Sequence, residues 1–320
     1  MARAMRFVLF VCLCLGLVPV ASVSAQTGLA TLTGIVTDES GAAVPGVSVT
    51  ATNQATNVNY TGLTNDAGTY VITSVPIGAY VVKSELTGFK VVQSNVQLSA
   101  AQTARVDFKL QVGAVAEQVE VVATSAVLQT ENAVVGQTLQ REQIEKLPVQ
   151  GRNLSTAALY APGVTTPNPS SFNSLKNTGG GRPYVNGQRE QANNFMLDGV
   201  DMNDAIDNLI AYQPSPDAVE QVSVETNNYS PELGNVAGAI VNMVIKSGTN
   251  SIRGNGFYYW RDNELAATPW ATNRAGGQKA DFSRKIFGGT VGGPIMKNKL
   301  FFFGDYQGGR QKSPPADSFK

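Results

Sequence analysis

The residues best suited to chemistry are the acids of one short stretch, where Asp198, Asp201, Asp204 and Asp207 follow one another with Asn203 among them. Such oxygen ligands could suggest calcium, which takes about six to eight oxygens from a loop whose spacing lets them converge. The spacing here matches no EF-hand loop. We therefore predict a solvated loop and no metal site.

Two absences restrict the chemistry further. The chain has no histidine, and its only cysteines are Cys12 and Cys14, close to the start. Once the leader that carries these cysteines is removed, the chain lacks histidine acid–base catalysis, a histidine-paired nucleophile and the common zinc or copper ligands. Carboxylates, lysine and tyrosine could still act, but the sequence predicts neither an enzyme nor a cofactor.

Length, composition and charge set the broad class. A chain of 320 residues suggests about two domains. Abundant glycine with sparse charge favours strands and turns. The 24 basic and 24 acidic residues balance, so no basic excess exists to neutralise phosphates, and nucleic acid is not expected as a partner.

The start of the chain has the pattern of a secretory signal peptide, assigned to residues 1–25. Arg3 and Arg6 precede an apolar run over residues 7–18 that is too short to span a bilayer. The small residues before Gln26 predict cleavage between Ala25 and Gln26. An uncleaved anchor is the alternative.

Residues 26–111 form a run of short apolar segments separated by turn residues. Alternation is clearest over residues 104–110, where Val106, Phe108 and Leu110 fall on one face. About seven strands at this spacing predict a small antiparallel β-sandwich.

The same region carries a motif that resembles the carboxypeptidase regulatory-like domain, a transthyretin-like fold. The resemblance rests on four segments, at residues 34–38, 41–49, 64–70 and 76–80. It implies no catalytic residues. The superfamily is often described as carbohydrate-binding-like, so sugar binding is a fold-level analogy.

Residues 112–132 read as a linker with one extended segment that has no obvious partner strand. An unpaired strand is a template for β-augmentation by another protein. The segment resembles the TonB box, the strand by which outer-membrane receptors engage TonB, and the predicted TonB-interacting residues are Val119, Glu120, Val121, Val122 and Ala123. A last sandwich strand or a plain linker is the alternative.

Residues 133–250 have a mixed α and β pattern. A helix is predicted over residues 138–147, and a second over 153–160, capped by Asn153 or Ser155. The segments Leu147-Pro, Gly151-Arg-Asn and Ala161-Pro-Gly-Val resemble the plug domain of TonB-dependent receptors of the Oar-like type.

Within this plug-like region, Asp198-Gly199 supplies a positive-φ turn between two strands. We favour that structural role. The alternative places Asp198, Gly199, Asp201 and Asp204 on the extracellular side of the plug, facing incoming ligand.

Residues 251–320 resemble the first strands of the barrel of the same receptors. Three strands are predicted, over residues 254–261, 284–295 and 299–308, with a long polar link before the second and a short one before the third. Long extracellular loops and short periplasmic turns are typical of transmembrane barrels. The aromatic residues are assigned to a wall that faces lipid. Three strands cannot close a barrel, so we expect an N-terminal fragment of a longer receptor.

The predicted fold is therefore mainly β: a transthyretin-like sandwich, an α+β plug and the first strands of an incomplete transmembrane β-barrel. The predicted function is TonB-driven import of an external nutrient, a glycan, peptide or chelate, across the outer membrane, with the sandwich in the periplasm. The expected partners are TonB, the ligand and outer-membrane lipid. The alternative is a surface carbohydrate-binding or adhesion protein without transport.

Overall fold

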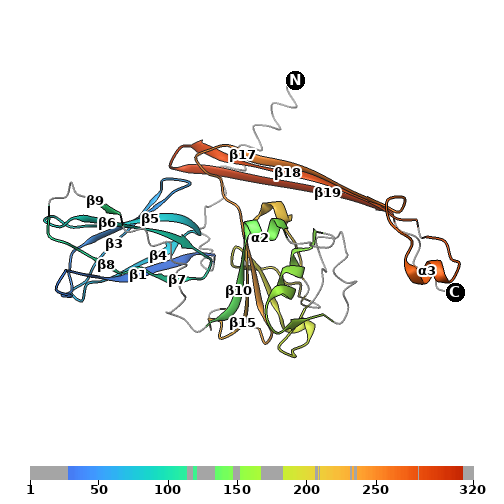
Figure 1. The fold of residues 1–320 in the computed structure, drawn as a ribbon, viewed down its shortest axis with the longest axis horizontal. Coiled ribbons are helices and arrows are strands. Elements are labelled where there is room, and N and C mark those ends of the chain that lie inside the picture. The colour runs from blue at the N-terminus through green and yellow to red at the C-terminus, as the bar shows by residue number, and fades with distance from the viewer. Residues whose placement is uncertain are drawn as a thin grey trace, which may run out of the picture.

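The computed structural model describes residues 28–113, 118–120, 134–146, 152–166, 183–205, 208, 210–230, 233, 236–279 and 281–312. The predicted signal peptide with its Ala25–Gln26 cleavage site, residues 121–123 of the predicted TonB-interacting segment, Leu147 and Asp207 lie outside these ranges. Figure 1 shows a β-sandwich beside an α+β body, with a long three-stranded sheet that passes over the α+β body and whose end reaches the near end of the sandwich. Among the described residues, no helix is both long and apolar enough to cross a membrane.

The sandwich consists of two sheets with one shared core. The first pairs β4 (Thr69–Val75) with β1 (Ala30–Thr37), which also pairs with β7 (Thr103–Arg105) and β8 (Phe108–Lys109). The second has the order β3 (Asn59–Leu63), β2 (Ser48–Asn53), β5 (Gly78–Glu85), β6 (Val91–Leu98) and β9 (Gln118–Glu120). Alternate residues of β1 are buried, as expected for a strand with one face on a core.

Two details of the sandwich differ from the prediction. Val106, Phe108 and Leu110 are buried as expected, but their stretch forms two short strands instead of one. The sandwich is also not wholly antiparallel, since β7 and β8 run parallel to β1, and β9 runs parallel to β6. After β6 the chain crosses to the other sheet instead of turning back as a hairpin, and a crossover permits parallel pairing.

The second body has a central sheet of order β10 (Val135–Gln140), β15 (Val219–Asn227), β16 (Ile240–Ile245), β13 (Asn194–Leu197) and β14 (Val200–Asp201). A small ribbon joins β11 (Val164–Thr165) and β12 (Tyr184–Val185). This body also contains four short helices, α2 (Arg141–Lys146), η2 (Leu154–Tyr160), η4 (Glu190–Ala192) and η5 (Pro216–Ala218), of which α2 packs on β10 and β15.

The first predicted helix of this body begins later than expected. Residues 138–140 belong to β10 and pair with residues 221–223 of β15. The available partner strand overrides the local helical pattern, and α2 starts only at Arg141. The second helix is confirmed as a 3₁₀ helix, and the side chain of Asn153 caps it by accepting a hydrogen bond from the Ser155 amide.

The third body is an antiparallel sheet of β17 (Arg253–Asp262), β18 (Ser283–Met296) and β19 (Leu300–Lys312). All three strands were predicted; β17 and β18 extend by one residue at each end, and β19 starts one residue later and ends four residues later than expected. The long link between β17 and β18 contains the unpredicted helix α3 (Trp270–Arg274). This body is called the wall below.

Candidate functional site

The plug-like body contacts the wall through Arg152, which precedes η2. Its guanidinium carbon lies 4.3 Å from the ring centroid of Phe257 and 4.7 Å from that of Tyr259, both on β17. Its Nε donates a hydrogen bond to Gln307 Oε1 on β19 at 3.0 Å. A cation over two aromatic faces is held by their quadrupoles, so one side chain connects this body to two strands of the wall.

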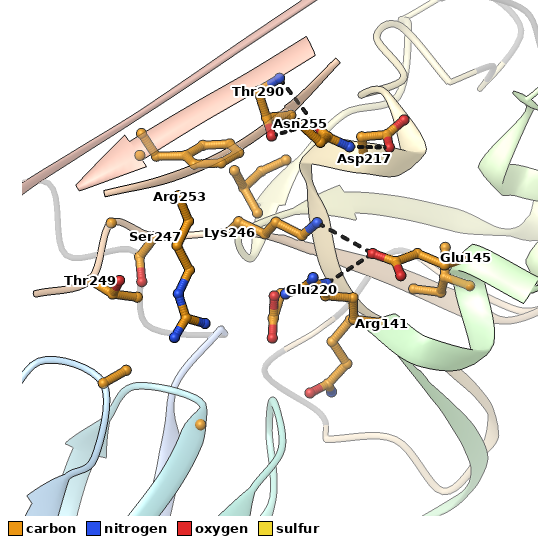
Figure 2. Close-up of a pocket in the computed structure, with 18 of the residues that line it drawn as sticks. Arg141, Glu145, Asp217, Glu220, Lys246, Ser247, Thr249, Arg253, Asn255 and Thr290 are labelled. Carbon is orange, nitrogen blue, oxygen red and sulfur yellow. Dashed lines mark hydrogen bonds and ion pairs between the residues drawn. The ribbon is translucent and has the colours of Figure 1, made fainter. Parts of the chain in front are cut away.

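Asp217 extends the contact, through Asn255 on β17, to Thr290 on β18. It forms an ion pair with Arg152, and both side chains are only 14% exposed. Asn255 Nδ2 donates to Asp217 Oδ1 at 2.7 Å, while Asn255 Oδ1 accepts from the Thr290 hydroxyl at 2.7 Å (Figure 2). We call Arg152, Asp217, Asn255, Thr290 and Gln307 the plug–wall contact.

The two faces of the wall differ in chemistry. Directly paired residues share a face, so the register places Phe257 and Tyr259 on the side of Arg152 with the polar partners. The opposite face carries exposed apolar residues, namely Tyr258, Trp260, Val291, Phe302 and Tyr306. The prediction that the aromatic residues face lipid is therefore wrong for Phe257 and Tyr259, because the strand alternates and their face meets Arg152.

A cavity of about 1770 Å³ lies between the sandwich, the plug-like body and the wall. Charged side chains of both signs project into it (Figure 2). Arg141 Nε lies 2.9 Å from Glu145 Oε1, and Lys246 Nζ lies 3.9 Å from the same oxygen. Burial lowers the pKa of Lys246 and raises that of Glu220. Mixed charges without a dominant sign suit a wet space better than a site for one charged ligand.

Asp198 and Gly199 form the tight turn between β13 and β14, with φ of 48° and 81°. Asp198 Oδ1 accepts from the Ile245 amide at 2.9 Å, and the Gly199 amide donates to Asn242 Oδ1 at 3.2 Å. Burial raises the pKa of Asp198. These bonds tie the turn to β16, close to where the chain leaves for the wall, and they favour the structural role over ligand contact.

The neighbouring acids form local contacts. Asp201 Oδ1 accepts from the backbone and side-chain amides of Asn203 at 2.8 and 2.9 Å. Asp204 is partly buried in the same loop. Among the described residues, no group of three or more histidine, cysteine, aspartate or glutamate side chains could hold a metal ion.

The first residues of the segment predicted to bind TonB lie in β9, the edge strand of the second sandwich sheet. Val92 pairs with Val119, and Gln93 with Glu120, in a parallel ladder between β6 and β9. The expectation of a segment without a partner strand is therefore wrong for these residues. The exposed edge of β6 supplies the partner, which corresponds to the alternative of a last sandwich strand.

Sequence reasoning identified no residue of the plug–wall contact as functional. Arg152 lies in the Gly151-Arg-Asn segment that resembles the plug domain. A charged residue within that segment was the one sign in the sequence that Arg152 could have a role. Asp217 and Asn255 gave none, because their meeting depends on packing between two bodies.

Three family models match the chain. Residues 31–111 match the carboxypeptidase regulatory-like domain, residues 129–241 the TonB-dependent receptor plug domain, and residues 244–319 an outer membrane beta barrel domain. A curated relative, the TonB-dependent transporter Oar of Myxococcus xanthus, is 30% identical over 273 residues, covering 81% of this chain and 25% of the relative. The chain thus spans about a quarter of that relative's length.

Solved structures similar to the chain include the siderophore receptor PirA of Pseudomonas aeruginosa, with a TM-score of 0.40 and 18% identity over 56% of this chain and 29% of PirA. The outer membrane transporter YddB of Escherichia coli has a TM-score of 0.46 and 13% identity over 56% of this chain and 26% of YddB.

Proposed function

We propose, from the premise that the chain belongs to the TonB-dependent receptors of the outer membrane, that it serves in the TonB-driven import of an external ligand. The observation that carries the proposal is the plug–wall contact. It seats the plug on one face of a wall whose other face is apolar and exposed. A domain held inside a membrane wall by a few polar side chains blocks passage until it moves.

The contact suits a plug that is displaced and then returns. Arg152 and Asp217 are paired within the plug itself, so neither charge is left alone when the plug leaves the wall. Separation breaks the bond from Arg152 to Gln307 and the bond from Asn255 to Asp217, together with the cation–π contacts. These groups can be hydrated once the cavity beside them opens to water. In this proposal TonB supplies the force, relayed from the inner membrane.

We infer that TonB engages the segment of Val119, Glu120, Val121, Val122 and Ala123. The edge position of β9 supports this, since a strand at a sheet edge can add a further strand. The test is retention of the full receptor on immobilised TonB periplasmic domain. Deleting residues 119–123 should abolish retention, while deleting residues 128–132 of the same linker should not. Equal retention of both deletions would refute the assignment.

The import proposal has a rival in a surface carbohydrate-binding or adhesion protein, which the family matches do not favour. The family matches also favour a transporter over an enzyme. Membrane fractionation of the full-length gene product distinguishes the import protein from the adhesion protein. A protein that stays with the outer membrane through high-salt washing supports import, whereas release by salt supports the adhesion protein. The ligand remains a glycan, a peptide or a chelate in this proposal.

A further inference from the structure

The end of the sandwich that faces the other two bodies carries contacts unrelated to its own fold. This end comprises the β2–β3 turn (residues 54–58) and the β6–β7 turn (residues 99–102), because β5 pairs the end of β2 with the end of β6. We call it the docking end. Its β2–β3 turn borders the cavity described above, with the plug and the wall on the other sides.

One contact of the docking end is a junction of three asparagines. Asn57 belongs to the β2–β3 turn, Asn250 to the link between plug and wall, and Asn298 to the β18–β19 turn. Asn298 Oδ1 accepts from Asn57 Nδ2 at 3.2 Å and from Asn250 Nδ2 at 2.7 Å, and the Asn298 amide donates to Asn250 Oδ1 at 2.8 Å. The Asn250 amide donates to the Ala55 carbonyl at 3.0 Å.

Local contacts fix the conformation of each part of this junction. Asn53 Oδ1 accepts from the amides of Ala55 and Thr56 and so fixes the β2–β3 turn. Asn57 and Asn298 have φ of 57° and 62°, a conformation that asparagine tolerates better than most residues. A side chain at Gly248 would collide with the carbonyl oxygens of Phe302 and Gly293, so the link packs directly on the wall.

The other contact of the docking end is with the plug sheet. Gln140 Nε2 donates to Ser99 Oγ at 3.2 Å, and the Ala100 amide donates to Gln221 Oε1 at 3.4 Å. Ala100 is buried and Gln221 is 1% exposed. The sandwich therefore touches the plug with one turn and the wall with the other.

We propose that the docking end is an intramolecular binding surface that holds the sandwich across the periplasmic end of the plug and the wall. The short β18–β19 turn identifies that end, because short turns of transmembrane barrels face the periplasm. Docked in this way, the sandwich holds a fixed position against the cavity and is not a freely tethered domain. Only the assignment of this side to the periplasm rests on the import proposal.

Cysteine pairs test the docking, since the chain has no cysteine after Cys14. The variant Ala55→Cys/Asn250→Cys keeps the backbone bond between these residues and brings two thiols within disulfide reach. The matched control is Ala67→Cys/Asn250→Cys. Ala67 is exposed in the β3–β4 turn, at the far end of β3 from the junction. Both are made in the full-length receptor and oxidised in outer-membrane vesicles.

The docked sandwich predicts at least about tenfold faster disulfide formation in the first pair than in the control, because docking raises the effective thiol concentration. Equal rates would overturn the proposal. Adding Asn298→Gly keeps the positive-φ turn but removes the side-chain oxygen that accepts from Asn57, which is the side-chain bond of the junction that remains once Asn250 is cysteine. The rate should then fall about fivefold, and an unchanged rate would overturn the role of the junction. Neither measurement uses TonB, so failure of the import proposal would leave both results standing.

Discussion

The sandwich and the plug bury different kinds of residue. Each body has a continuous apolar cluster, but they differ in the polar side chains that they bury. The buried polar side chains of the sandwich, among the described residues, are Asn53, Thr64, Ser84, Ser94 and Gln102. The plug buries a larger set, namely Asn153, Ser155, Asn193, Asn194, Gln213, Ser215, Gln221, Ser223, Thr226 and Asn242.

Many of these plug side chains replace regular backbone pairing. Asn193 Nδ2 donates to the Pro183 carbonyl at 2.7 Å, and its Oδ1 accepts from the Ala239 amide at 2.9 Å. A core of this kind is specific in geometry but gains less from apolar burial. From this difference we expect the plug to open at a lower free energy than the sandwich.

The largest expected effect tests the sandwich side of this comparison. Leu32 is 0% exposed in the sandwich core, and Leu32→Ala should lower the free energy of unfolding of the sandwich by about 4 kcal/mol through lost burial and a cavity. Amide hydrogen exchange, followed peptide by peptide, should show the loss in the sandwich and unchanged protection in the plug sheet. The control Leu63→Ala, at a site 67% exposed, should shift protection by less than about 0.5 kcal/mol. Loss of plug protection in Leu32→Ala would show that the two cores are not independent.

The next effect tests how the plug is held. Arg152→Ala leaves the carboxylate of Asp217 buried without its ion-pair partner, and the plug should lose about 3 kcal/mol of stability in its seated position. The urea concentration at which the full receptor begins to conduct ions in a planar bilayer should fall accordingly. Arg141→Ala is the matched control, because its ion pair with Glu145 is 43% and 48% exposed and contributes at most about 1 kcal/mol. Equal shifts in the two variants would remove Arg152 from the contact.

The sequence predicted the elements that depend on neighbours along the chain. The cap at Asn153, the Asp198–Gly199 turn and the three wall strands all follow from local patterns, and the structure contains each of them. What the sequence could not reveal depends on a partner far away. Residues 138–140 form a strand because they pair with β15, and β9 forms because it pairs with the edge of β6.

The candidate site was harder to predict for the same reason. Arg152 and Asp217 are far apart in sequence, and Phe257 and Gln307 lie on yet other elements. Single residues of these types are common on protein surfaces. Only the packing of plug on wall gives them a shared role, so a sequence pattern alone carries no sign of it.

A smaller effect compares the two cores directly through matched serines. The hydroxyl oxygens of Ser84 in the sandwich and Ser223 in the plug are both buried and, within the described residues, have no hydrogen-bond partner. Replacing each by alanine removes an unmet polar group and should stabilise its own body by about 1 kcal/mol. Peptide-resolved hydrogen exchange under rising urea measures each body separately. A stabilised sandwich beside an unchanged plug would mean that polar burial is not what weakens the plug.

The smallest effect concerns pH and belongs to the plug alone. Burial raises the pKa of Glu220 above its usual 4.5, opposed by Arg141 and Lys246 and reinforced by Glu142 and Glu145. The native plug therefore holds this proton more tightly than the unfolded chain, so ionisation costs stability as pH rises from the unfolded value through the folded one. The urea midpoint of plug release, measured by conductance from about pH 4 to about pH 7, should decline less steeply in Glu220→Gln than in the native protein. The control is Glu142→Gln, because Glu142 is exposed; this variant should keep most of the native dependence of the urea midpoint on pH. If both variants retained the full slope, the pH dependence would have to arise outside the cavity.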